Sequence, residues 1–240
     1  MSAHPTTPPS YRRVLANREF RALYGARVLS DWGDAIARVA IAALVLHRSG
    51  SALFSAAVFA VSFLPQVFGQ ALLAPYADRV SRRTLLVVCD LLRAAFVVVL
   101  VLAVTAHLPL VVLLLLLFVV ELVGAPFFAA GYALLTELFD DHSLFLRASA
   151  LTSLTSQLNQ VLGVALGGLV VGVLGASLAL WIDAGTFVVS AVILSVSVQT
   201  RAAAAALGLP GLSDLWRDVR EGLVYLRGDV PLRALLVLAW

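Results

Sequence analysis

Four charged residues lie at helical spacing within one apolar stretch near the start of the chain. Arg27, Asp31, Asp34 and Arg38 fall within about 60° of one another when residues are placed every 100° around a helix. A charge at the centre of a bilayer costs roughly 2.5–3.5 kcal/mol, so this stripe is expected to face a bundle interior or a water-filled cavity. We predict that Asp34 pairs with Arg38, one turn further on.

A second carboxyl group, Glu121, lies in a later apolar run and has no cation within one helical turn. An isolated carboxyl group in apolar surroundings can take up and release a proton. Two alternatives are open for Asp34 and Glu121: they couple transport to protons, or they form structural salt bridges and hydrogen bonds.

Other polar residues in apolar stretches have two possible roles, contact with a substrate or contact between helices. Asp31, Arg38, Gln157, Asn159 and Gln160 are the predicted wall of a substrate cavity.

Three further charged residues share one face of the stretch around residue 90. Arg83, Asp90 and Arg93 are predicted to form a structural network rather than to contact a substrate. Asp183 is predicted to be a solvated residue near the outer end of its span.

The sequence contains no recognisable metal-binding or nucleotide-binding motif. His47, His107 and His142 lie at the ends of apolar stretches without a second ligand at metal spacing, and Cys89 is interpreted as a packing residue. The chain has no lysine, so it cannot contain an ATP-binding loop of the G-x-x-x-x-G-K-S/T type. We expect no cofactor, no metal ion and no enzymatic activity.

The elements that position these residues are long apolar helices. Of the 240 residues, 61% are hydrophobic and 13% are charged, which excludes an ordinary soluble domain. A membrane-spanning helix needs about 20 apolar residues, and the runs do not alternate as barrel strands would. Six spans are predicted, at 20–46, 52–77, 84–105, 109–135, 148–173 and 176–198, and a seventh begins near residue 231.

The chain is expected to divide into four parts. Residues 1–19 form a cytoplasmic tail, 20–199 a six-helix transmembrane bundle, 200–230 a cytoplasmic linker with an amphipathic helix, and 231–240 the start of helix 7.

The arginines predict the orientation. Most of them lie before or at the start of the first span and in the 2–3, 4–5 and 6–7 connections, whereas the opposite connections hold only Arg48. Because basic loops stay inside, we expect a multi-pass plasma-membrane protein with a cytoplasmic N-terminus. The positive charge therefore reports topology, and nucleic acid is not an expected partner.

The connection between the second and third spans carries a motif. Residues 74–83, APYADRVSRR, resemble the signature loop of the major facilitator superfamily, G-x-x-x-D-R/K-x-G-R-R/K. The resemblance implies that Asp78, Arg79, Arg82 and Arg83 form a conformational-switch loop, although Ala74 and Ser81 replace two glycines.

A second motif lies in the fifth span. Residues 163–168, GVALGG, resemble the G-P-x-x-G-G antiporter motif of proton-coupled exporters, with Val164 in place of the proline. Gly163, Gly167 and Gly168 are also a predicted helix-packing motif, because small residues let backbones approach closely.

Segments at Gly33-Asp34, 133–138 and 221–226 resemble the macrolide-efflux and enterobactin-exporter-like branch of this superfamily. The resemblance implies an all-α polytopic membrane fold, namely the N-terminal six-helix bundle of a twelve-helix transporter, truncated in helix 7. It implies proton-coupled efflux of a hydrophobic or amphipathic small molecule. The implied partners are the lipid bilayer, the substrate, protons, and a missing C-terminal bundle or a second copy. The alternatives are a half-length binding or regulatory subunit and a half-transporter that acts as a homodimer.

Overall fold

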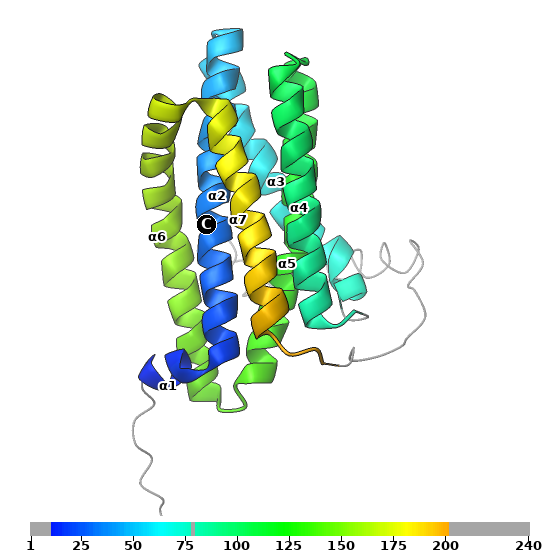
Figure 1. The fold of residues 1–240 in the computed structure, drawn as a ribbon, viewed down its shortest axis with the longest axis vertical. Helices are drawn as coiled ribbons and strands as arrows, with labels where there is room; N and C mark the ends of the chain where they lie inside the picture. Colours follow the sequence, from blue (N-terminus) through cyan, green and yellow to red (C-terminus); the bar gives the residue numbers. More distant parts are fainter. Residues whose placement is uncertain (1–10, 78–79, 202–240) are drawn as a thin grey trace, which may run out of the picture.

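The computed structural model describes residues 11–77 and 80–201, and long helices dominate these ranges (Figure 1). The helices in chain order are α1 (Tyr11–Ala16), α2 (Arg18–Ser49), α3 (Ala52–Ala77), α4 (Arg82–Thr105), α5 (Leu110–Leu138), α6 (His142–Leu174) and α7 (Ala176–Ser197). No strand occurs in the described ranges. The predicted all-α fold is confirmed. Apart from residues 200 and 201, the predicted linker and the start of a seventh span lie outside the described residues.

Each of the six predicted spans corresponds to one long helix, from α2 to α7. Four of these helices, α4 to α7, are long and apolar enough to cross a membrane. α2 has 32 residues and a length of about 48 Å, but its charged stripe makes it less apolar. The predicted tail also contains a short helix, α1, which buries Val14.

Capping residues explain where several helices begin and end. Asn17 accepts hydrogen bonds from the backbone N–H groups of Glu19 and Phe20 at the start of α2. Gly50 ends α2 in the left-handed conformation, at φ 64°. Asp141 caps α6 by accepting from Ser143, and these hydrogen bonds lower the pKa of the Asp141 carboxyl.

α2 is the central helix of the bundle. It packs against α7, α6 and α3, while α4 packs against α7 and α5. Figure 1 shows α2 (blue) between α6 (yellow-green) and α7 (yellow to orange). The outward side of α6 exposes large apolar side chains such as Val161, Leu169 and Val173, as expected of a surface that meets lipid.

The buried core has two apolar parts. One is built around Ile41, Leu100 and Phe187, and the other around Phe20 and Leu134. The buried acidic and basic side chains of the described residues lie at or near the level where these parts meet. We call them the central polar layer: Asp34, Asp90, Arg93, Glu121 and Asp183.

Candidate functional site

An ion pair between α2 and α4 forms the middle of the central polar layer. Nη2 of Arg93 donates to both carboxylate oxygens of Asp34, at 2.7 and 2.8 Å. The Arg93 side chain is only 1% exposed, and its guanidinium lies 4.1 Å from the centre of the Phe187 ring. Gly124 of α5 lies against this guanidinium, because a Cβ there would be 3.3 Å from Cζ of Arg93.

A second ion pair joins α2 to α5. Nη1 of Arg38 donates to Oε1 of Glu121 at 3.1 Å. The predicted pair of Asp34 with Arg38 is therefore wrong, and so is the isolation of Glu121. Both predictions considered neighbours on one helix only, whereas Asp34 and Arg38 each bind a partner on another helix.

Two acidic residues of the layer, Asp90 and Asp183, form no ion pair at contact distance with a described basic residue. Ser190 of α7 donates a hydrogen bond to Oδ2 of Asp90. Asp183 of α7 is fully buried, and neither of its carboxylate oxygens has a hydrogen-bond partner in the described part of the chain. The predicted solvated position of Asp183 is wrong, because α7 packs this face against α2. The contact is close: a Cβ on Gly33 would lie 2.4 Å from Oδ1 of Asp183.

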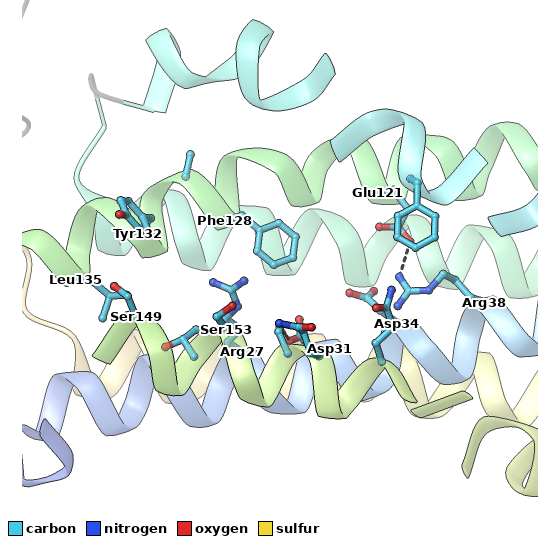
Figure 2. Close-up of a pocket in the computed structure, with 16 residues that line it drawn as sticks. Arg27, Asp31, Asp34, Arg38, Glu121, Phe128, Tyr132, Leu135, Ser149 and Ser153 are labelled. Carbon is cyan, nitrogen blue, oxygen red and sulfur yellow. Dashed lines mark hydrogen bonds and ion pairs between the residues drawn. The ribbon is translucent and has the colours of Figure 1, made fainter. Parts of the chain in front are cut away.

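A cavity of about 710 Å³ opens beside the layer and reaches along α2 (Figure 2). It is lined mainly by α2, α5 and α6 and also by Phe63 of α3. All four stripe residues line it, as does Glu121. Asp31 accepts a hydrogen bond from Ser156 at 2.6 Å, and the guanidinium of Arg27 lies 4.7 Å from the centre of the Phe128 ring.

The five residues predicted to line the cavity fall into two groups. Asp31, Arg38, Gln157 and Gln160 line the cavity. Asn159 does not: it is buried and accepts a hydrogen bond from Nε1 of Trp32 at 2.6 Å, so it joins α6 to α2.

Several lining residues were missed by the sequence analysis. They are mostly hydroxyl and aromatic residues: Phe63, Phe128, Tyr132, Ser149, Thr152, Ser153 and Ser156. The spacing of the hydroxyl residues of α6 in the sequence could have identified them as one face of a helix. Together with Gln157 and Gln160 they recur at intervals of three and four residues, which places them on one face of a helix.

Comparison with known proteins supports a family assignment. The sequence profile of the Major Facilitator Superfamily matches residues 23–240. The chain belongs to the major facilitator superfamily. It is 25% identical over 230 residues to YkuC of Bacillus subtilis (strain 168), described as an uncharacterized MFS-type transporter. The match covers 93% of this chain and 53% of that relative, so the chain spans about half of the relative's length. Together with the apolar helices, family membership indicates a multi-pass membrane protein.

The structure describes only part of the segment that resembles the superfamily signature loop. Asp78 and Arg79 lie outside the described residues. Nε of Arg82 lies 3.5 Å from Oε1 of Glu137 at the end of α5. Arg83 donates to Thr200 at 2.6 Å and to the backbone oxygen of Ser195, so it ties the start of α4 to the end of α7.

Arg83, Asp90 and Arg93 form no hydrogen bond or ion pair with one another in the described part of the chain, and none of them lines the cavity, as expected of residues that do not contact a substrate. Arg83 binds residues at the end of α7, whereas Arg93 binds Asp34 and Asp90 binds Ser190. The three residues share α4, but they contact different partners at different levels of the bundle.

The glycine motif of α6 faces α2 at two of its positions. A Cβ on Gly163 would lie 2.4 Å from Cβ of Ala35, and one on Gly167 would lie 3.1 Å from Cγ2 of Val39. No described atom lies within 4 Å of the corresponding position on Gly168. Gly163 and Gly167 thus permit the close approach of α6 to α2.

The described ranges contain no cluster of three or more histidine, cysteine or acidic residues that could hold a metal ion. Cys89 is buried in the apolar core.

Proposed function

We propose that the chain forms the N-terminal half of a transporter that exports a hydrophobic or amphipathic small molecule in exchange for protons. The observation that carries this proposal is the cavity of about 710 Å³, whose wall includes two carboxylates that form ion pairs between helices. A cavity of this size accommodates a drug-sized molecule. Its aromatic side chains suit an apolar solute, and family membership supports transport rather than catalysis.

Proton binding has a direct structural consequence in this proposal. A proton on Asp34 removes the charge that holds Arg93 of α4, and a proton on Glu121 removes the charge that holds Arg38 of α2. Either event weakens a contact between helices. The populations of the outward-open and inward-open states then shift, while the solute leaves by alternating access.

The second bundle is part of the proposal. A relative about twice as long supports a full transporter with a C-terminal bundle. A parallel homodimer of half-transporters and a half-length binding or regulatory subunit are the alternatives. The reading frame beyond Trp240 discriminates them: five further spans support the full transporter, and an immediate stop codon supports an alternative.

We further propose that the protein resides in the plasma membrane with its N-terminus in the cytoplasm, and that it belongs to the macrolide-efflux and enterobactin-exporter-like branch. The positions of the arginines support the orientation. Arg201 binds Glu19 at 2.8 and 3.0 Å, so the basic ends of α2 and α7 lie together. Arg48 lies at the other end of the bundle, where it binds the backbone oxygen of Val104 at 2.9 Å. Cysteines placed at positions 48 and 82 should react with impermeant thiol reagents from opposite sides, and reaction from one side would contradict the topology.

Transport can be tested in everted membrane vesicles that contain the product of the full reading frame, with an imposed pH gradient. The probes are ethidium and 8-anilinonaphthalene-1-sulfonate, two amphipathic dyes of opposite charge. We expect gradient-driven accumulation of at least one dye, with a loss of tenfold or more in Asp34→Asn or Glu121→Gln. Asp140→Asn, a change at an exposed position outside the cavity, is the control.

The outcomes separate the two parts of the proposal. Normal gradient-driven accumulation by both Asp34→Asn and Glu121→Gln would contradict proton coupling and leave transport intact. No accumulation of either dye by the wild type would contradict export of amphipathic molecules.

A further inference from the structure

Arg27 is the one stripe residue that forms no hydrogen bond and no ion pair at contact distance with a described residue. Its guanidinium lies over Phe128, at 4.7 Å, and it forms no hydrogen bond or ion pair with any described residue. Its Nε is buried and has no acceptor there. The other arginine of the cavity, Arg38, binds Glu121. A partly buried cation whose N–H groups have no anionic acceptor is unfavourable, so its surroundings are expected to accommodate an anion.

The nearest carboxylate on the same helix does not supply this anion. Asp31 lies one turn beyond Arg27, and its Oδ2 accepts the hydrogen bond from Ser156. The charge of Asp31 attracts Arg27, but no described contact brings the two side chains within ion-pair distance, so Asp31 compensates the cation only in part. Figure 2 shows both side chains at the cavity wall, with Arg27 nearer to the end that holds Tyr132 and Ser149.

The groups around Arg27 can also bind an anion. Ser149 Oγ is buried without a hydrogen-bond partner in the described part of the chain, and Ser149 lines the cavity. Ser153 lines it as well, on the same face of α6. A hydroxyl group can donate to an anionic oxygen, as the N–H groups of a guanidinium do. Phe128 and Tyr132 provide aromatic surface beside these donors.

We propose that this end of the cavity is a subsite for the anionic group of a small organic molecule, a carboxylate, sulfonate or phosphate attached to an aromatic or otherwise apolar body. The anion binds Arg27 with Ser149 and Ser153, and the apolar body packs on Phe128 and Tyr132. This inference rests on the proposed function and narrows its substrate class from amphipathic molecules to amphipathic anions.

The subsite can be tested without transport, by measuring whether a bound probe protects a cysteine in the cavity from a thiol reagent. Cys89 is the only cysteine, so Cys89→Ser with Gln157→Cys places one reactive thiol on the cavity wall, outside the subsite. The rate of its reaction with N-ethylmaleimide is measured with three probes of one shape: 2-naphthoate, 2-naphthamide and 2-naphthylmethylamine. Their charges are negative, neutral and positive.

We expect 2-naphthoate to slow the reaction at concentrations at least tenfold lower than 2-naphthamide does. Arg27→Gln should remove this difference, and Arg27→Lys, which keeps the charge, should retain part of it. Arg48→Gln removes a charge outside the cavity and should leave the difference unchanged. An unaltered reaction rate without probe shows that each variant keeps the cavity.

Four results would overturn the inference: equal protection by naphthoate and naphthamide, preference for the amine, a preference for naphthoate that persists in Arg27→Gln, or no protection by any probe. An anionic lipid headgroup has the same chemistry, so the assay is repeated in nanodiscs with and without phosphatidylglycerol. Protection by that lipid, with none by naphthoate, would also overturn the assignment to a small molecule.

The inference and the proposed function can fail separately. Gradient-driven transport by vesicles without a preference for naphthoate in the protection assay overturns the subsite alone. A preference for naphthoate that depends on Arg27, without transport of either dye, overturns the proposed function and leaves the anion subsite supported.

Discussion

The two halves of the charged stripe on α2 differ in what their side chains contact. In the second half, Asp34 binds Arg93 of α4 and Arg38 binds Glu121 of α5, at distances of 2.7 to 3.1 Å. In the first half, Asp31 has one hydrogen bond from Ser156, and Arg27 contacts an aromatic ring. The two halves of the stripe lie on the same face of α2 but have different roles. The second half holds helices together, and the first half leaves charges available at the cavity.

The largest effect is expected from removing Arg93, the cation of α4 that binds Asp34 in the second half of the stripe. Arg93→Gln leaves the carboxylate of Asp34 buried without its partner, and breaking a buried ion pair costs about 3–5 kcal/mol. We expect that loss in the free energy of unfolding, measured by SDS titration in mixed micelles.

The double variant Asp34→Asn with Arg93→Gln is the control for this prediction. Because it leaves no uncompensated charge at this pair, it should recover about half or more of the lost stability. A single variant as stable as the wild type would show that the two halves of the stripe do not differ in this way.

A pair of glycines on α2 compares the two halves by packing. A Cβ on Gly33 would lie 2.2 Å from Oγ1 of Thr186 and 2.4 Å from Oδ1 of Asp183, whereas no described atom lies within 4 Å of the same position on Gly25. Gly33→Ala should therefore destabilise the bundle by about 1–3 kcal/mol. Gly25→Ala should stabilise it by about 0.5–1 kcal/mol, because alanine favours the helix.

Thermal unfolding of the two alanine variants in detergent checks this order. Equal transition temperatures for Gly33→Ala and Gly25→Ala would mean that α7 does not pack on α2 as closely as the structure shows.

The sequence was sufficient to predict the helices and the presence of the stripe. A run of about 20 apolar residues satisfies its own backbone hydrogen bonds, so each span is encoded locally. The stripe follows from the 100° period within one helix. These features depend on residues near one another in the chain, and the structure places helices at all six predicted spans.

The partners of the charges could not be predicted in the same way. Asp34 and Arg93 are 59 residues apart, and Arg38 and Glu121 are 83 residues apart. Which helices meet, and at what rotation, depends on the packing of whole faces, including the close contacts of Gly33 and Gly163. Asp183 was misplaced for the same reason, since its burial is decided by the face of α7 that meets α2.

A smaller effect is expected from the hydrogen bond of Asp31. Ser156→Ala removes the donor, but Asp31 lies at a cavity that can hold water, so the cost should be about 1 kcal/mol. The SDS titration measures this change as well. Thr155→Val is the matched control on α6, because it removes a hydroxyl that contacts Tyr24 at 2.6 Å and does not line the cavity. A cost for Ser156→Ala as large as that for Arg93→Gln would show that Asp31 holds helices together as Asp34 does.

The smallest effect on stability is expected at Arg27. Because its guanidinium forms no hydrogen bond or ion pair at contact distance with the described residues, Arg27→Gln removes the cation–π contact with Phe128, which contributes about 0.5–1 kcal/mol, and the longer-range attraction of Asp31. Relief of an uncompensated charge acts in the opposite direction. The net change in the free energy of unfolding should therefore lie within about 0.5 kcal/mol of zero, by the same SDS titration. A loss comparable to that of Arg93→Gln would show that Arg27 is a structural residue and that the stripe has one role along its whole length.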